Sequence, residues 1–198
     1  MFLGTQTLSY LSNPGGAINH SMDKDEENKL VEMIKVGNIF IYPTDTVYGI
    51  GCNALNEESV LRIKEIKGRD AGKPLSVIAP SKDWIYSNLF ADKGRVDKYL
   101  PGRYTLILKK KEKGFLDYVS SGETLGVRIP VHWFAGLVAK SGVPFITTSA
   151  NLSGEKAAAE LRDIAKEVLE KADVVINDGK LPGQPSTIVL ENGEELKR

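Results

Sequence analysis

The stretch from Ile39 to Asn53 limits the possible folds more than any other, because a strand-like run changes abruptly into a loop rich in hydroxyl groups. Its first four residues are β-branched or aromatic, which predicts a buried strand that breaks at Pro43. The sequence Thr-Asp-Thr follows at 44–46, where a continuing strand would need apolar side chains, and two glycines come soon after. This pattern is typical of a ligand-binding loop. The alternative is a plain polar connection with glycines for the turn.

A second segment, residues 144–154, repeats this change from an apolar start to an end rich in hydroxyl groups and small residues. Open α/β sheets bind ligands at the carboxyl ends of their strands, which is where both segments would place their hydroxyl groups. We therefore expect the two segments to share one site.

Helical patterns occur before, between and after these two segments. Apolar residues at helical spacing predict one helix that begins at Ser21 or Asp23 and another that begins at Asn56. Gly37 marks the end of the first of these helices. Residues 157–169 form a further, strongly helical stretch. Together with the strand patterns, this alternation predicts an α/β fold.

The chain has 198 residues, of which 41% are hydrophobic and 26% charged, as is ordinary for a globular α/β domain. No internal repeat or linker divides it, so residues 21–198 are predicted to form a single domain and residues 1–20 an edge strand or a flexible leader. One cysteine excludes an intramolecular disulfide, and no apolar run approaches the roughly 20 residues that cross a bilayer. A cytoplasmic protein without membrane contact is therefore predicted.

Cations gather at the end of the second predicted helix. Lys67, Arg69 and Lys73 are separated by glycines, which suits the binding of a polyanion such as a triphosphate. The alternative is that cations stabilise the helix C-terminus and bind no ligand. A basic run at residues 109–113 is open to the same two interpretations, an RNA-facing patch or a solvated hairpin end. Because the formal net charge is zero, any anion site must be local.

The available side chains exclude several classes of chemistry. Two histidines and one cysteine are too few for an ordinary Cys/His zinc site. The sequence contains no Gly-x-Ser-x-Gly elbow, no P-loop and no dinucleotide fingerprint. What remains is a set of hydroxyls, backbone amides and cations. This set suits adenylyl or phosphoryl transfer, in which the substrate brings the nucleophile and the protein stabilises phosphate charge.

Five motifs occur in a fixed order along the chain. They are Pro43-Thr44-Asp45-Thr46-Val47-Tyr48-Gly49, Lys67-Gly68-Arg69 with Lys73-Pro74-Leu75, Gly126-Val127-Arg128-Ile129-Pro130, Ser149-Ala150-Asn151-Leu152-Ser153-Gly154 and Ser186-Thr187-Ile188-Val189. In this order they resemble the YrdC-like family of threonylcarbamoyl-AMP synthases, in its short single-domain form, over about residues 25–190. The resemblance implies a twisted open mixed sheet flanked by helices, with a concave, positively charged cleft.

The resemblance also implies a reaction. L-threonine, bicarbonate and ATP condense to threonylcarbamoyl-AMP and pyrophosphate, and tRNA-modifying partner proteins then transfer the threonylcarbamoyl group to an adenosine beside the anticodon. Magnesium is expected with the triphosphate, bound through phosphate oxygens rather than by a protein cage.

Roles carry over from the family motif by motif. L-threonine is implied to be bound by Thr46, Tyr48, Arg128 and Ser186. ATP is implied to be bound by Lys67, Arg69, Lys73, Thr124, Thr147, Ser149, Asn151 and Arg198, and catalytic roles fall to Lys67, Arg69, Ser149 and Asn151. Thr124 and Arg128 lie four residues apart on one predicted strand, so they share a face and resemble a pair that reaches across both substrates.

The sequence departs from the family pattern in three places. Ile78 lies near a place where some relatives have a histidine, and Arg103 stands where the family often has a proline. Residues 156–158, Lys-Ala-Ala, replace a serine and a proline of the family, which would remove one contact with ATP.

Two other functions compete with the synthase. A non-catalytic module could bind tRNA or double-stranded RNA through the same basic cleft, but no aromatic residue lies among the cations of residues 64–73 to stack on bases. A carbamoyl-adenylate domain of hydrogenase maturation has the same implied fold, but the zinc-finger and acylphosphatase-like segments of such proteins are missing from this sequence.

Overall fold

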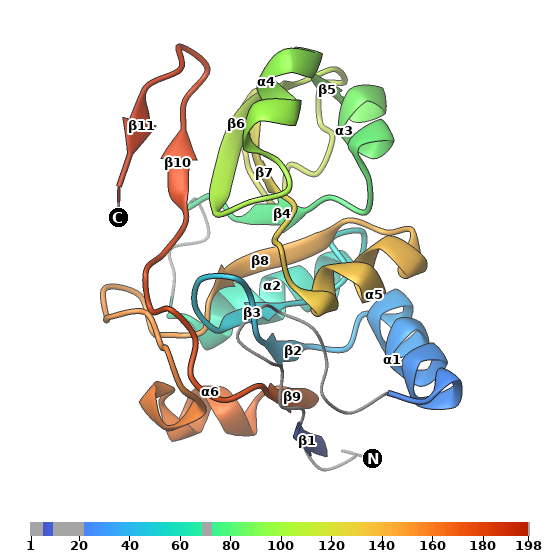
Figure 1. The fold of residues 1–198 in the computed structure, drawn as a ribbon, viewed down its shortest axis with the longest axis vertical. Coiled ribbons are helices and arrows are strands. Elements are labelled where there is room, and N and C mark those ends of the chain that lie inside the picture. The colour runs from blue at the N-terminus through green and yellow to red at the C-terminus, as the bar shows by residue number, and fades with distance from the viewer. Residues whose placement is uncertain (1–5, 10–21, 69–72, 198) are drawn as a thin grey trace.

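The computed structural model describes residues 6–9, 22–68 and 73–197. In this part of the chain one mixed sheet runs in the order β1-β9-β2-β3-β8-β4-β7-β6-β10-β11, and β5 pairs with β6 (Figure 1). The strands are β1 Gln6–Ser9, β2 Phe40–Tyr42, β3 Gly49–Gly51, β4 Ser76–Ile78, β5 Leu89–Phe90, β6 Tyr104–Lys110, β7 Thr124–Arg128, β8 Phe145–Ser149, β9 Val174–Asn177, β10 Thr187–Val189 and β11 Glu195–Leu196. The prediction of an α/β domain with an open mixed sheet is confirmed.

Helices flank both halves of this sheet (Figure 1). Among the described residues they are α1 Lys24–Val36, α2 Glu57–Ile66, α3 Lys82–Asn88, α4 Lys93–Tyr99, α5 Trp133–Ser141 and α6 Lys166–Glu170, and a 3-10 turn, η1, lies at Leu161–Asp163. The predicted caps are confirmed for α1 and α2, since the side chains of Asp23 and Asn56 accept hydrogen bonds from backbone amides in the first turns. Gly37 ends α1 with a φ of 94°, a left-handed conformation that favours glycine.

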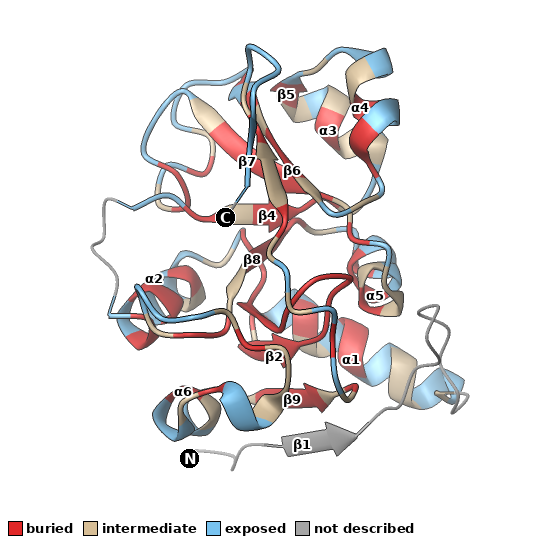
Figure 2. Cartoon of the chain, turned by 60° about the vertical axis from the view of Figure 1, so that its left-hand side comes forward, coloured by how far each residue is buried: buried red, intermediate tan, exposed pale blue. Residues whose placement is uncertain are grey.

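Alternation along β2 divides the core into two layers. Ile39 and Ile41 point to one face and join a large apolar cluster that includes residues of α2. Phe40 and Tyr42 point to the other face, where they pack against α1 and α5. Buried strands therefore lie between helices whose outer faces are exposed (Figure 2).

The glycines after the 44–46 loop are needed because the protein packs closely against its own backbone. A side chain at Gly51 would place its Cβ 1.9 Å from the Ile146 carbonyl oxygen on the neighbouring strand β8. A side chain at Gly49 would place its Cβ 2.8 Å from the Tyr42 ring. The strand β3 can therefore lie between β2 and β8 only because it is almost without side chains.

The prediction of a continuous helix over residues 157–169 is wrong. Other segments use the backbone there: the Ala158 carbonyl accepts from the Tyr48 amide at 2.9 Å, and the Ala159 carbonyl accepts from the Leu181 amide at 2.9 Å. The Asp163 carboxylate accepts from the Ala159 amide at 3.2 Å, which starts η1 instead of a longer helix. Tertiary hydrogen bonds thus override a strong local helix propensity.

Candidate active-site cleft

All five sequence motifs contribute residues to one cleft of about 500 Å³. Its walls are the β2–β3 loop, the carboxyl end of β8 with the loop that follows, the amino end of β4, the end of β7 and the segment before β10. Pairing explains the convergence, because β3 lies between β2 and β8 and is antiparallel to both, so that β2 and β8 end at the same edge. The two segments therefore line one cleft, as predicted for a shared site.

The β2–β3 loop is held by its own hydroxyl groups. Thr44 Oγ1 accepts from the backbone amides of Thr46 and Val47, at 3.1 and 3.2 Å, and donates to the Val47 carbonyl at 2.8 Å. It also lies 2.8 Å from Thr46 Oγ1. This turn fixes the buried Thr46 side chain at the cleft wall, where the sequence placed it.

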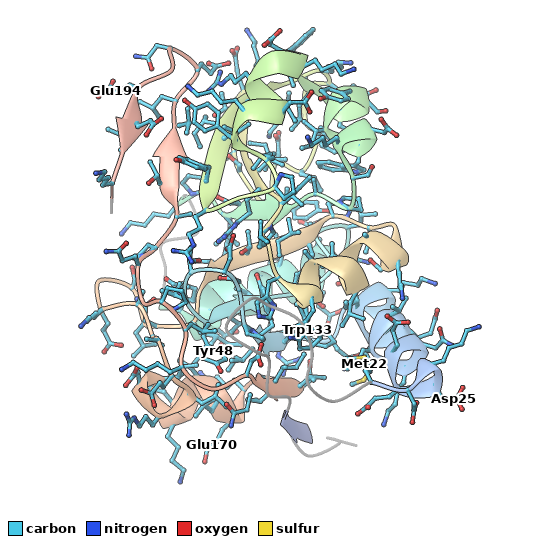
Figure 3. All side chains as sticks on the ribbon, in the orientation of Figure 1. Met22, Asp25, Tyr48, Trp133, Glu170 and Glu194 are labelled. Atoms are coloured by element: carbon cyan, nitrogen blue, oxygen red, sulfur yellow. The ribbon has the colours of Figure 1, made fainter. Side chains whose placement is uncertain are left out.

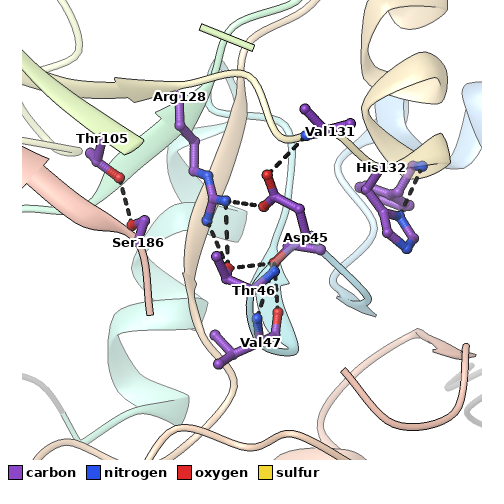
Figure 4. A network of polar contacts seen from close by, with 10 residues as sticks. Asp45, Thr46, Val47, Thr105, Arg128, Val131, His132 and Ser186 are labelled. Carbon is purple, nitrogen blue, oxygen red and sulfur yellow. Dashed lines mark hydrogen bonds and ion pairs between the residues drawn. The ribbon is translucent and has the colours of Figure 1, made fainter. Parts of the chain in front are cut away.

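A buried ion pair lies beside Thr46 at the cleft wall (Figure 4). Arg128 Nη2 donates to Asp45 Oδ1 at 2.5 Å, and the two side chains are 6% and 5% exposed. The other carboxylate oxygen of Asp45 accepts from the Val131 amide at 3.0 Å. Both terminal nitrogens of Arg128 also lie 3.4 to 3.5 Å from Thr46 Oγ1. Arg128 therefore lines the cleft, and Asp45 is the partner that sequence reasoning missed.

Two polar atoms beside the cleft are buried and have no hydrogen-bond partner among the described residues. One is Arg128 Nε, which can only donate, and the other is Asn151 Oδ1, which can only accept. Unsatisfied buried groups are costly, and a water molecule or a bound ligand could supply the missing partner of each.

Lys67 lies beneath the loop after β8 rather than in the cleft wall. Its side chain is buried, and Nζ donates to the carbonyls of Ser149 and Asn151, the second at 2.6 Å. The Lys67 carbonyl in turn accepts from the Ser153 amide at 3.2 Å. Ser149 and Asn151 line the cleft, whereas Lys67 is not among the residues that do. This geometry indicates that Lys67 supports the loop, and its predicted contact with phosphate stays a prediction.

The segment before β10 forms the facing wall. Ser186 Oγ and Thr105 Oγ1 lie 2.8 Å apart, and both residues are buried and line the cleft (Figure 4). Gly183 also lines the cleft, and its amide donates to the Thr46 carbonyl at 2.9 Å. Thr105 was not among the predicted site residues, although it lies only two residues after Arg103.

Tyr48, labelled in Figure 3, is fully buried and is not among the residues that line the cleft. Its hydroxyl accepts from the Asp178 amide at 2.9 Å and donates to the Gly179 carbonyl at 2.8 Å. Burial raises the pKa of Tyr48 to about 12, so the phenol stays neutral. Its predicted influence on the threonine site can therefore act only through the segment that it holds.

The remaining predicted residues are more scattered. Thr147 lines the cleft, and Lys73 is exposed next to the lining residue Pro74. Thr124 begins β7, about 13 Å from Arg128 at about 3.3 Å per residue. The two share a face, but Thr124 does not line the cleft, so this placement does not support a pair that reaches across both substrates. Arg69 and Arg198 lie outside the described residues.

Among the described residues, the cations that line the cleft are Arg128 and Lys156, and the lining carboxylate is Glu155. Lys156 is one of the residues that depart from the family pattern, and no sequence signal placed it here. Ile78, by contrast, is fully buried in the apolar layer that contains Phe134, Phe145 and the buried residues of α1 and α5.

The described residues hold no group of three or more His, Cys, Asp or Glu that could bind a metal ion. The thiol of Cys52 is fully buried, and this burial raises its pKa well above the ordinary value, which leaves it unsuited to act as a nucleophile. None of the described helices is long and apolar enough to cross a membrane.

A family model described as "Telomere recombination", for Sua5, YciO and YrdC proteins, matches residues 32–197. This chain belongs to the Sua5/YciO/YrdC family. A candidate threonylcarbamoyl-AMP synthase of Methanocaldococcus jannaschii is 42% identical over 186 residues, which cover 89% of this chain and 87% of that protein. The threonylcarbamoyl-AMP synthase of Pyrococcus abyssi is 32% identical over 162 residues.

The Sua5/YciO/YrdC chain described here spans about half of the P. abyssi protein, covering 48% of its length. The crystal structure of P. abyssi Sua5 complexed with L-threonine matches the fold with a TM-score of 0.80 at 27% identity. That match covers 95% of this chain and 55% of the P. abyssi chain. The resemblance drawn from the five motifs is therefore confirmed.

Proposed function

We propose that this chain is an L-threonylcarbamoyladenylate synthase. The observation that carries the proposal is the convergence of Thr46, Arg128, Ser149, Asn151 and Ser186 on one cleft, although they come from four separate segments. These are residues that the motifs assign to L-threonine and ATP. The family's threonylcarbamoyl-AMP synthases and the Sua5 complex with L-threonine support the same assignment.

The chemistry needs no nucleophile from the protein. The amine of L-threonine takes up bicarbonate with loss of water and becomes a carbamate. One carbamate oxygen then attacks the α-phosphorus of ATP, the bond to the β-phosphate oxygen breaks, and pyrophosphate leaves. The protein holds two substrates in line and stabilises the charge on the phosphates, which a cleft of hydroxyls, amides and cations can do.

L-threonine binds at the end of the cleft where Arg128 and Thr46 meet. The unpartnered Nε of Arg128 can donate to the substrate carboxylate, and the Asp45 carboxylate keeps the guanidinium in place. Ser186 and Thr105 offer hydroxyl groups at the facing wall for the substrate's own hydroxyl. Tyr48 takes part only indirectly.

ATP binds along the loop after β8. Ser149 offers a hydroxyl, and Asn151 Oδ1 is a buried acceptor that suits an amine or hydroxyl of the nucleoside. Arg69, Lys73 and Lys67 are proposed for the phosphates, with Thr124, Thr147 and Arg198 as further contacts from the family pattern.

Magnesium comes with ATP. Because the described residues offer Glu155 alone as a lining carboxylate, the cleft fits an ion held by phosphate oxygens and water rather than by a protein cage. Bound there, the ion neutralises charge on the triphosphate.

The product is a mixed anhydride, so it must be passed quickly to an acceptor. We propose that tRNA-modifying partner proteins in the cytoplasm receive the product and transfer its threonylcarbamoyl group to tRNA. No observation favours the RNA-binding module: of the lining cations among the described residues, Arg128 is already paired with Asp45, which leaves Lys156.

The decisive experiment measures pyrophosphate release from ATP and bicarbonate with and without L-threonine, with L-serine as the control. Release that depends on L-threonine is expected, and Arg128→Ala should abolish that dependence. ATP binding without any turnover, together with retention of RNA that weakens with salt, would contradict the synthase and favour the binding module.

A further inference from the structure

The segment from Asp178 to Ser186, here called the strap, is the part of the cleft wall with the least regular structure. It joins β9 in one half of the sheet to β10 in the other without helix or strand of its own (Figure 1). Yet Gly183, Pro185 and Ser186 at its far end line the cleft. Something other than secondary structure must therefore fix its position.

The far end is held by contacts already described. The Gly183 amide donates to the Thr46 carbonyl at 2.9 Å, and Ser186 Oγ lies 2.8 Å from Thr105 Oγ1. Both contacts join cleft-lining residues, so a shift of the strap would move the wall on which L-threonine is proposed to bind.

The near end is held by a buried carboxylate. Asp178 Oδ2 accepts from His132 Nε2 at 2.9 Å and from Trp133 Nε1 at 3.0 Å. The Asp178 side chain is fully buried and that of His132 is 5% exposed. A buried carboxylate is costly unless it is hydrogen-bonded, so these donors and the strap start are tightly linked. The Asp178 amide donates to Tyr48, which follows Thr46 in the β2–β3 loop.

His132 has two separate contacts. Nδ1 accepts from the Phe134 amide at 3.4 Å and thereby caps α5. Since a backbone amide can only donate, Nδ1 carries no hydrogen, and in the neutral ring Nε2 is the atom that donates to Asp178. His132 directly follows Val131, whose amide donates to Asp45, so the linker between β7 and α5 touches both carboxylates.

We propose that His132 and Asp178 are positioning residues that set the strap across the cleft and so determine the affinity for L-threonine. The expected effect on the KM for L-threonine rests on the proposed function. The claim that His132 and Asp178 fix the position of the strap does not. The affinity for ATP should change less, because Lys67 holds the loop of Ser149 and Asn151 independently of the strap.

Two substitutions separate the two contacts of His132. In His132→Asn the short amide can still cap α5, because asparagine is a favoured N-cap residue, but it cannot reach Asp178. In His132→Gln the longer side chain can place an amide nitrogen near the position of Nε2 and keep the bond to Asp178, while the cap is lost. The pair therefore serves as its own control for stability.

We expect His132→Asn to raise the KM for L-threonine about tenfold, the loss expected for one hydrogen bond to a charged group, with kcat and the KM for ATP nearly unchanged. His132→Gln should keep the wild-type KM for L-threonine and lose thermal stability. Equal KM values for L-threonine in the two variants would overturn the proposal.

Hydrogen exchange of the Gly183 amide tests the mechanical part without any activity. Exchange should be faster in His132→Asn than in the wild type and in His132→Gln. An unchanged rate in His132→Asn would overturn the proposal. If the wild type releases no pyrophosphate in response to L-threonine, the proposed function fails, and the exchange rate still decides whether His132 holds the strap.

Discussion

The Asp45–Arg128 pair gives the sharpest prediction, because one substitution should affect both stability and the end of the cleft where L-threonine is proposed to bind. Asp45→Ala removes the acceptor of two donors, Arg128 Nη2 at 2.5 Å and the Val131 amide at 3.0 Å. Both charged side chains are nearly fully buried, at 5% and 6% exposure. The guanidinium would remain in the protein without a counter-charge.

The expected loss in the free energy of unfolding depends on the groups that Asp45→Ala leaves without a partner. Breaking a buried ion pair by removing one partner costs about 3 to 5 kcal/mol, and an unpaired buried amide costs about 1 kcal/mol or more. Since water can reach Arg128 through the cleft, we expect the lower end, a loss of about 3 to 4 kcal/mol in the free energy of unfolding. Asp45→Asn keeps the volume and one acceptor, so it should cost about 2 kcal/mol.

Urea unfolding of Asp45→Ala, Arg128→Ala and the double variant measures the coupling. The double variant should be about as stable as either single variant, because it leaves no buried charge unpaired. Glu32→Ala is the matched surface control, because Glu32 pairs with Lys35 at 2.7 Å in an exposed position and should contribute less than about 0.5 kcal/mol. A cost below about 1 kcal/mol for Asp45→Ala, or additivity in the double variant, would refute the reasoning.

Gly51→Ala should destabilise the protein by about 3 kcal/mol or more in urea unfolding, because its Cβ would meet backbone at 1.9 Å, whereas Gly136→Ala in α5, with nothing within 4 Å, should be neutral or stabilising. Lys67→Met should raise the KM for ATP about tenfold and leave that for L-threonine unchanged; the reverse would contradict the support role. Burial raises the pKa of Tyr48 from 10.0 to about 12, so the folded state keeps a proton that the unfolded state loses. Stability should therefore fall by up to about 2 kcal/mol as pH rises from 10 to 12, and Tyr48→Phe should flatten that slope in alkaline unfolding curves.

Local signals in the sequence predicted what local chemistry determines. Asp23 and Asn56 are helix caps because their side chains satisfy amides within the same turn, and Gly37 ends α1 because it adopts positive φ. The change from apolar to hydroxyl residues located the β2–β3 loop and the end of β8, and topology brings both to one edge.

Long-range polar contacts could not be predicted in this way. Residues 157–169 have helix-forming side chains, but their backbone bonds to Tyr48 and to the strap instead. Lys67 was predicted as a phosphate ligand from charge and spacing, and charge alone does not reveal that its amine reaches two carbonyls 82 and 84 residues away in sequence.

Two of the walls of the candidate cleft are loops without regular secondary structure, so side-chain contacts must help to fix them. Three buried polar groups provide such contacts: Asp45 holds Arg128, Asp178 holds the strap through His132, and Lys67 holds the loop of residues 149–151. Each joins a lining segment to one distant in sequence. The five motifs therefore contain two kinds of residue, those that line the cleft, such as Arg128, and those that hold its walls, such as Lys67. Buried charges of the second kind should alter one substrate's KM at a time, since each holds a different wall.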